Sequence, residues 1–498
     1  MLYKKLNLPI NLPLANDEEI EVNEVENNII IKLRNVSNIN IDATIRLFES
    51  FFENSLSSAT KENLSKIFKE IVPIIFRNKH KEEGLYQLLR YVNSLNSNLD
   101  YLEILKNSSF VYENLSKVLS FSGILTDILS RDMKLLEVLQ PEYAIRLNGN
   151  ISYYKNSFEK LDLQNYETED MLNALRKHHR LTKFQILFAL INNEISLERA
   201  SSEFSYLAQA TVDYVLQIVK LETYNSHNIN CEDFCIIAYG RFGTFTMTSN
   251  SDLDLVFVYG KKFERKIYVN IFRKLINILS TKTSEGILYE VDTKLRPSGN
   301  HGPVACTFEN FENYHKNMSY CWEKIALKKT RVITENKFSD SISKLLNKLN
   351  LLPISDGDVI EEIKKMRINV NELKNRNEKE KLDKKILSKW FETKYVAGGQ
   401  RDIEFLKFFY EKDSKFIDKY EMDKKLLSFK KLESIFFQLD QVVNICFVNE
   451  KQSNLPNAAI NLLINELNEK DLGSLKASIS QGKINIFNTL NKIIESKL

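Results

Sequence analysis

Most of the chain alternates polar and apolar residues with the period of an amphipathic helix, and one stretch departs from this pattern. Over about residues 41–139 and again over residues 175–220, apolar side chains recur every three or four positions, which places them on one helix face. The second region predicts two helices interrupted near residues 192–194. In the later helix an apolar stripe predicts a buried face; its members are Phe204, Leu207, Ala208, Thr211, Val215 and Val219.

Residues 236–302 replace the helical pattern with short apolar runs and glycine turns. The window holds six of the chain's 14 glycines, and glycine supplies tight turns and close approach of the backbone to a ligand. Apolar runs at residues 234–239 and 253–259 predict two buried strands, and residues 287–295 predict a third. The chain as a whole therefore predicts an α+β fold that is predominantly α, with a small mixed sheet between helical domains.

Three aspartates give this window its chemistry. Asp252 and Asp254 are two residues apart at the start of the second predicted strand, so their side chains point to the same face. Asp292 lies in the third predicted strand. Adjacent carboxylates repel each other, a cost that is tolerable when a cation lies between them or when one is protonated. Mg2+ prefers such oxygens, and two metals sharing three carboxylates suit displacement at phosphorus; for an isolated aspartate pair, the alternative is a solvated strand end.

Glycines and basic residues beside the aspartates are candidates for binding phosphate. The segment from Gly240 to Gly243 predicts a tight turn after the first strand, whose amide groups and Arg241 are placed to hold a triphosphate. Lys294 and Arg296 follow the third aspartate at spacings that place them on its face of the predicted strand. There they would neutralise phosphate oxygens or pair with carboxylates.

Four strings together resemble the glutamine synthetase adenylyltransferase family: GRFG followed by SDLDL, then VDTKLRPSGNHGPVA, YCWEKIALKKTRVI and AGGQRDIEF. The resemblance covers roughly residues 85–495 and is tight at these motifs. Members of that family attach AMP to a tyrosine of glutamine synthetase and remove it, usually with two modules in one chain, and this chain has room for one. Its DLDL and LRPSG wording is closer to the adenylylating module.

The resemblance implies a polymerase-beta-like nucleotidyltransferase core that uses ATP and two Mg2+ ions. It makes Asp252, Asp254 and Asp292 the metal ligands and the catalytic residues. A tyrosine hydroxyl of glutamine synthetase, activated near Asp292, would attack the α-phosphorus, and pyrophosphate would leave. Glutamine synthetase is the implied protein partner, and control by a small nitrogen-signalling regulatory protein is left open. The residues expected to bind the nucleotide are Gly240, Arg241, Gly243, Ser251, Lys294 and Arg296.

The chain departs from the family's pattern at four positions. Phe245 stands where arginine is usual and Thr246 where an acidic residue is usual, and Lys294 and Lys329 replace arginines. Lysine keeps the charge but loses the bidentate geometry of arginine. Two alternative functions stay open: phosphorolytic removal of AMP by the same carboxylates, and a non-catalytic binding module left from a two-module ancestor.

Charge and cysteine content exclude other classes of protein. Charged residues nearly balance, for a net charge of +3, so nothing favours a nucleic-acid or membrane partner. No apolar run is long enough to cross a bilayer. The five cysteines are odd in number and scattered, which predicts reduced thiols, a cytoplasmic protein and no zinc site.

We expect four segments along the chain. They are a polar, partly disordered leader over residues 1–40 with one strand at 28–33, a helical region over 41–225, a catalytic domain over 226–335 and a C-terminal helical bundle over 350–498.

Three further stretches of the chain carry local expectations. Residues 308–333 predict one continuous helix. The basic cluster around His178 and His179 predicts a solvated helix face, with contact to a phosphate or an acidic partner as the alternative. The family resemblance implies that AGGQRDIEF, residues 397–405, closes over the nucleotide site from the C-terminal bundle.

Overall fold

The chain divides into two compact units in the computed structural model. One unit comprises residues 1–146, 187–195 and 445–465, and the other comprises residues 147–186, 196–444 and 466–498. The four segments predicted from the sequence stay a prediction. The residues that the structure describes are 20–25, 28–33, 70–72, 74–75, 77, 81–94, 109–121, 123–132, 134–140, 147, 149–161, 168–365, 390–394, 396–412, 422–446 and 455–497.

A hairpin and several short helices make up the described N-terminal part of the first unit. β1 (Ile20–Val25) pairs antiparallel with β2 (Asn28–Leu33). β2 has the predicted bounds, whereas β1 was missed because charged and amide residues separate its apolar side chains. α3 packs against α5 and α6. The helices are α3 (Lys81–Ser94), α5 (Ser109–Phe121), α6 (Gly123–Arg131) and α7 (Leu135–Val138).

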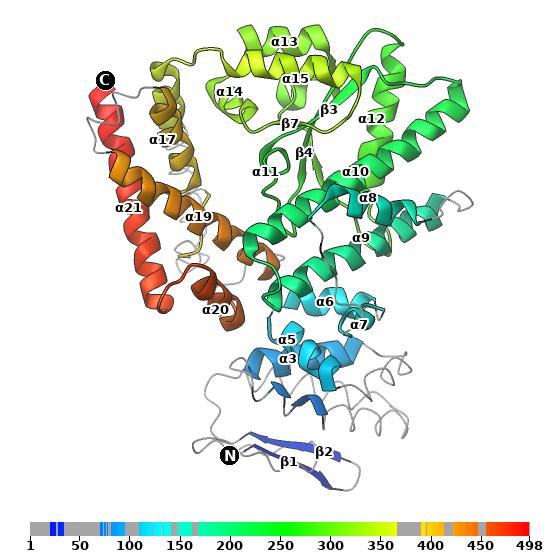
Figure 1. The fold of residues 1–498 in the computed structure, drawn as a ribbon, viewed down its shortest axis with the longest axis vertical. Helices are drawn as coiled ribbons and strands as arrows, with labels where there is room; N and C mark the ends of the chain where they lie inside the picture. The colour runs from blue at the N-terminus through cyan, green and yellow to red at the C-terminus, as the bar shows by residue number, and fades with distance from the viewer. Residues whose placement is uncertain are drawn as a thin grey trace, which may run out of the picture. The chain divides into compact units, whose positions relative to one another are not determined.

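A five-stranded mixed sheet forms the centre of the second unit (Figure 1). Its order is β5-β4-β3-β7, and β6 also pairs with β4. β3 and β4 are antiparallel, whereas β5 and β6 run parallel to β4. Both longer strands confirm the prediction, with β3 ending one residue early. The strands are β3 (Phe234–Ala238), β4 (Leu253–Tyr259), β5 (Val291–Asp292), β6 (Ala305–Thr307) and β7 (Arg331–Val332).

The prediction of a third long strand over residues 287–295 is wrong. Only Val291 and Asp292 pair with β4. Immediately afterwards the chain turns, and the amide of Arg296 donates to the carbonyl of Thr293 at 3.3 Å. Lys294 and Arg296 therefore lie in a turn beyond the strand and do not continue the strand face on which Asp292 lies.

Helices cover both faces of the sheet. Because side chains alternate along a strand, Ile237 and Val256 pack into one apolar cluster with residues of α13, α14 and α15. On the other face, Phe257 stacks on Phe272 of α12 with ring centroids 4.6 Å apart. These helices are α12 (Arg265–Ser280), α13 (Phe308–Asn317), α14 (Cys321–Leu327) and α15 (Lys337–Asn350).

The single helix predicted over residues 308–333 is also wrong. α13 ends at Asn317, α14 begins at Cys321, and β7 follows. The carboxylate of Glu323 accepts a hydrogen bond from the backbone amide of Tyr320 at 2.8 Å. This satisfies an amide that has no partner inside the helix, so it favours a new helix start at this point.

The two helices predicted over residues 175–220 are confirmed. They are α9 (Thr168–Ile191) and α10 (Leu197–His227). The side chain of Ser196 caps α10 by accepting from the amide of Arg199 at 3.1 Å. The predicted stripe on α10 is at most 3% exposed, and α10 packs against α12 and α8 (Ile151–Glu159).

The basic cluster on α9 is buried or half-buried apart from the exposed Lys177, contrary to the predicted solvated face. The exposed fractions of Arg176 and His179 are 1% and 5%. The guanidinium of Arg176 donates to the carbonyls of Ile278, Thr281 and Gly286, and Arg180 pairs with Glu285 at 2.8 Å. The cluster is internal because its arginines bond carbonyl oxygens and a carboxylate at the end of α12 and in the chain that follows it. The helical pattern of α9 does not reveal this long-range pairing.

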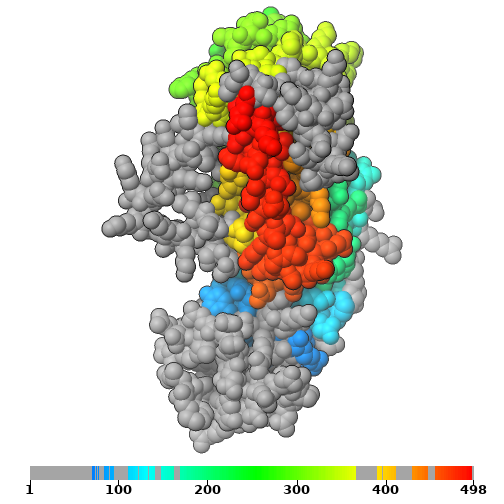
Figure 2. Space-filling view, turned by 90° about the vertical axis from the view of Figure 1, so that its left-hand side faces the viewer, coloured from blue at the N-terminus to red at the C-terminus, as the bar shows by residue number. Residues whose placement is uncertain are grey.

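Helices also form the described C-terminal part of the chain. α17 packs against α21, and α21 lies at the surface in Figure 2. Gly398 has φ of +73°, and a Cβ atom there would collide with the carbonyl oxygen of Lys483 in α21. Within the described residues, no helix has both the length and the apolar character needed to span a membrane. The helices are α17 (Gln400–Lys412), α19 (Met422–Cys446), α20 (Asn457–Glu466) and α21 (Leu472–Lys497).

Candidate active site

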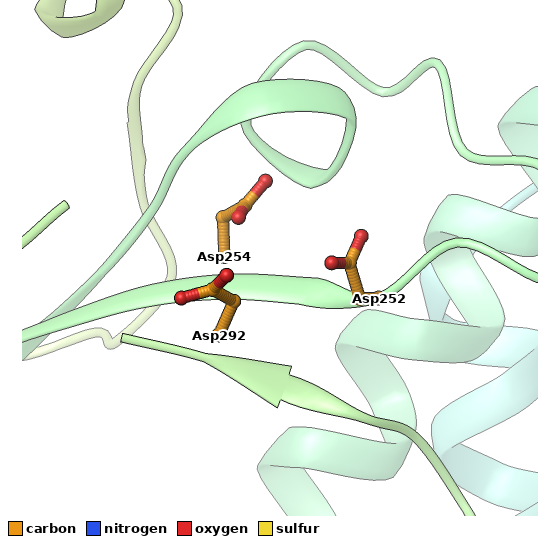
Figure 3. A group of neighbouring side chains, drawn as sticks. All are labelled: Asp252, Asp254 and Asp292. Atoms are coloured by element: carbon orange, nitrogen blue, oxygen red, sulfur yellow. The ribbon is translucent and has the colours of Figure 1, made fainter. Parts of the chain in front are cut away.

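The sheet brings the three predicted aspartates together (Figure 3). Asp254 is the second residue of β4 and lies opposite Asp292 of the parallel strand β5. Asp252 is two residues before Asp254, so it projects from the same face. One carboxylate oxygen from each aspartate lies within 4.8 Å of the others. We call this group the carboxylate cluster; its role as a metal site stays a prediction.

The three carboxylates have different electrostatic environments. Burial raises the pKa of Asp254 to about 7, and the charges of Asp252 and Asp292 add to the rise, while Lys394 and Lys294 oppose it. Burial would also raise the pKa of Asp292, but hydrogen bonds from the ammonium and amide of Lys294 outweigh it and lower that pKa. Negative charge is therefore least well compensated at Asp254.

The donor set fits a hard divalent cation. Among the described residues, no hydrogen bond or ion pair reaches the carboxylates of Asp252 and Asp254, while Lys294 pairs with Asp292 at 2.8 Å. Three carboxylates this close repel one another, and one lysine compensates only part of their charge. A bound cation would therefore stabilise them. Mg2+ takes oxygen ligands and usually completes its shell with water and phosphate.

Gly240 and Gly243 form a single helical turn, α11 (Gly240–Gly243), rather than the predicted tight turn. Gly240 has φ of +57°, and a Cβ atom there would lie 2.5 Å from Oδ2 of Asp254. A Cβ atom on Gly243 would lie 2.8 Å from the carbonyl oxygen of Ala238 and would collide with that of Lys329. Glycine is required at both positions because the turn touches the carboxylate cluster on one side and backbone on the other.

Arg241, the basic residue of this turn, is bound by the C-terminal helices. Its Nη2 atom donates to Oδ2 of Asp440 in α19 at 2.5 Å, and 34% of its side chain stays exposed. The nearby Ser251 supports the backbone, since its hydroxyl accepts from the amide of Thr248 at 2.9 Å. The structure thus places Arg241 directly after Gly240, which approaches Asp254, and uses Ser251 to hold the loop before β4.

Arg296 is placed differently from its prediction. It is 8% exposed, and its guanidinium donates to the carbonyl oxygens of Thr293 at 2.8 Å and Gly302 at 3.2 Å. These bonds close the loop that follows β5. Its hydrogen bonds in this structure thus hold the loop, its charge helps to lower the pKa of Asp292, and its role in binding the nucleotide stays a prediction.

The positions that depart from the family pattern have local partners. Phe245 has φ of +57°, and its ring lies under the guanidinium of Arg331 at 3.9 Å. Burial lowers the pKa of Arg331 to about 10, so an arginine at position 245 would add a second cation beside a poorly solvated one. Thr246 shares a hydrogen bond with Thr244 at 2.7 Å, and Lys329 pairs with Glu404 of α17 at 2.5 Å.

Sequence reasoning missed four residues that the structure places at or near this site. Asp440 accepts hydrogen bonds from Thr393 and Gln400 as well as from Arg241, and the charge of Lys394 acts on Asp254. Gln400 is the one of the four that lies inside a recognised motif, AGGQRDIEF. Nothing in the spacing of the others marks them, because their partners lie 47 to 199 residues away or on another element.

The chain is similar to known proteins over most of its length. Residues 112–343 match the family model described as glutamate-ammonia ligase adenylyltransferase. The chain is 27% identical over 370 residues to the bifunctional glutamine synthetase adenylyltransferase/adenylyl-removing enzyme of Bartonella quintana, which covers 71% of this chain and 37% of that protein. The protein of the same name from Mannheimia succiniciproducens is 27% identical over 417 residues, or 78% of this chain and 41% of that protein.

The chain spans about two fifths of the length of the curated relatives it matches. The family model covers both strands that present Asp252, Asp254 and Asp292, together with the Gly240 turn. The sequence resemblance is thus confirmed over residues 112–343, which match the model of the glutamate-ammonia ligase adenylyltransferase family.

Proposed function

We propose that the chain is a nucleotidyltransferase that transfers AMP from ATP to a tyrosine hydroxyl of glutamine synthetase. The observation that carries the proposal is the carboxylate cluster, in which oxygens of Asp252, Asp254 and Asp292 lie within 4.8 Å of one another. The sheet around it has the strand, turn, strand order expected of a polymerase-beta-like nucleotidyltransferase core. The family match over residues 112–343 supports the reaction and the acceptor.

The residues of the site divide the work between charge and position. Asp252, Asp254 and Asp292 would hold two Mg2+ ions, which supply neutralisation of the phosphate charge when bound. Gly240 lets the backbone of α11 approach the cluster without a side chain in the way. Arg241, together with the lysines at positions 294 and 394, provides positive charge for the triphosphate. Positioning and charge neutralisation then lower most of the barrier.

The direction that we propose is addition of AMP. The DLDL and LRPSG strings are closer to the adenylylating module, while the relatives are named for both addition and removal. Removal would use the same carboxylates with orthophosphate as the attacking group. Incubating adenylylated glutamine synthetase with the chain and orthophosphate tests it directly, since removal releases ADP.

Transfer of label from α-labelled ATP tests the proposal. With Mg2+ and purified glutamine synthetase from the same cell, we expect labelled glutamine synthetase. Asp254→Asn should reduce the rate by about a hundredfold or more, because it removes one carboxylate charge from the cluster. Asp340→Asn, an exposed aspartate in the first turn of α15, is the matched control and should keep full activity. Equal labelling by the wild type and Asp254→Asn would overturn the site assignment.

A further inference from the structure

Asp440 of α19 accepts hydrogen bonds from three side chains on two segments of the chain. Its Oδ2 atom accepts from Nη2 of Arg241 and from Nε2 of Gln400, both at 2.5 Å. Its Oδ1 atom accepts from the hydroxyl of Thr393 at 2.6 Å. Only 15% of its side chain is exposed. Both carboxylate oxygens are thus engaged in a partly buried setting, where charge-assisted hydrogen bonds are strong.

The three donors come from the turn beside the carboxylate cluster and from the segment that leads into α17. Arg241 follows Gly240, whose Cα lies against Asp254. Thr393 precedes Lys394, the basic residue whose charge acts on Asp254, and Gln400 is the first residue of α17. One carboxylate therefore bonds the cation Arg241 on one segment and two neutral side chains on the segment that also carries Lys394.

This contact holds Arg241 and leaves other N–H donors of its guanidinium available to a ligand. Of its five N–H donors, the Nη2 group bonds Asp440, and a third of the side chain is exposed. A long, exposed arginine samples many rotamers, and fixing one of them costs entropy when a ligand binds. An acidic partner that holds the side chain beforehand removes much of that cost.

We propose that Asp440 is a positioning residue for the nucleotide: it holds Arg241, and with it the segment bearing Thr393 and Gln400, in place beside the carboxylate cluster. The inference rests on the proposed function, because the ligand that Arg241 meets is the triphosphate of ATP. Asp440 itself contacts neither the cluster nor, in this proposal, the nucleotide. It acts through Arg241.

Binding of MgATP to the full chain, measured by titration calorimetry, tests this role. Asp440→Asn should raise the Kd about tenfold, because asparagine loses the charge and presents an amide donor to side chains that are themselves donors. Asp440→Glu keeps the charge and should recover part of the affinity. Glu433→Gln is the matched control. It removes a different ion pair of α19, the one with Lys407 of α17, and should leave the Kd unchanged.

A double-mutant comparison separates positioning from a general structural effect. Arg241→Ala should weaken binding about as much as Asp440→Asn does, and the double variant should bind no worse than Arg241→Ala alone. Additive losses would overturn the inference, as would unchanged or tighter binding by Asp440→Asn. If the wild type itself binds no MgATP, the proposed function falls and this inference falls with it; wild-type binding that Asp440→Asn leaves intact overturns the inference alone.

Discussion

Gly240 brings the backbone of α11 close to Asp254 of the carboxylate cluster. It adopts φ of +57°, and a side chain there would meet Oδ2 of Asp254 at 2.5 Å. We predict that Gly240→Ala lowers the free energy of unfolding by about 1–2 kcal/mol, because L residues are strained in this region. AMP transfer should fall further than this loss accounts for, since the new methyl group displaces Asp254. Urea unfolding and the labelling assay measure the two effects separately.

Gly357 provides the control for that substitution. It lies in a helical segment, and a Cβ atom there would have ordinary van der Waals contact, 3.9 Å from Oγ of Ser355. Alanine is the better helix former by up to about 1 kcal/mol, so Gly357→Ala should leave stability unchanged or raise it and should not affect transfer. Equal behaviour of the two variants would contradict the special role of Gly240.

At the residue scale, the sequence predicts contacts that follow from local geometry. Asp252 and Asp254 share a face because strand side chains alternate, and that reasoning needs no knowledge of the fold. Asp292 joins them only through parallel pairing of β5 with β4. Asp440 is out of reach of such reasoning, because its partner Arg241 is 199 residues away and a single aspartate in an amphipathic helix looks like any solvated one.

α10 has a buried face and an exposed face, so substitutions on the two faces test how this helix packs. Leu207 is fully buried, whereas Leu221 on the same helix is 57% exposed. We predict that Leu207→Ala lowers the free energy of unfolding by about 3 kcal/mol, through lost burial and the cavity left behind. Leu221→Ala should change it by less than about 0.5 kcal/mol. Chemical denaturation of both variants measures the difference, and similar losses would mean that the stripe does not pack as the structure shows.

Elements were predictable where their own composition marks them. β3 is a continuous apolar run and β4 is apolar apart from Asp254, and Gly240 and Gly260 follow them, so their bounds are visible in the sequence to within one residue. β5 is only two residues long and depends on a neighbour for its pairing. The break between α13 and α14 contains neither glycine nor proline, and it depends on the hydrogen bond that Glu323 accepts from the amide of Tyr320. Tertiary contacts decided both cases.

At the scale of the whole molecule, segments far along the chain supply ion-pair partners to residues near the sheet. The family model ends at residue 343, yet Lys329 pairs with Glu404 and Arg241 pairs with Asp440. The C-terminal helices are therefore part of the environment of the Gly240 turn. A chain shortened after α15 would leave Arg241 and Lys329 without these acidic partners, so we expect the C-terminal helices to be needed for nucleotide binding as well as for stability.

Buried histidines make the stability of the second unit depend on pH. Burial lowers the pKa of His178 and of His315 to about 4, and it lowers that of His179 further. An unfolded chain binds these protons near pH 6.5. The folded state therefore binds fewer protons between about pH 4 and 6.5, so the stabilisation is complete above pH 6.5 and is lost as the pH falls. Each histidine should lower the free energy of unfolding by up to about 1.4 kcal/mol per pH unit between about pH 6 and pH 4.

A variant at His315 isolates one of these contributions. His315 packs edge-on against Phe311, with ring centroids 4.5 Å apart, and neither ring nitrogen has a hydrogen-bond partner among the described residues. His315→Phe keeps an aromatic ring there and cannot titrate. Urea unfolding at pH 6.5 and pH 5.5 should show a loss of stability that is smaller in this variant by about 1 kcal/mol. The difference between the two proteins is the informative quantity, because the raised pKa of Asp254 changes the stability of both in the opposite direction. Parallel losses in wild type and variant would show that His315 binds its proton as readily in the folded state as in the unfolded chain.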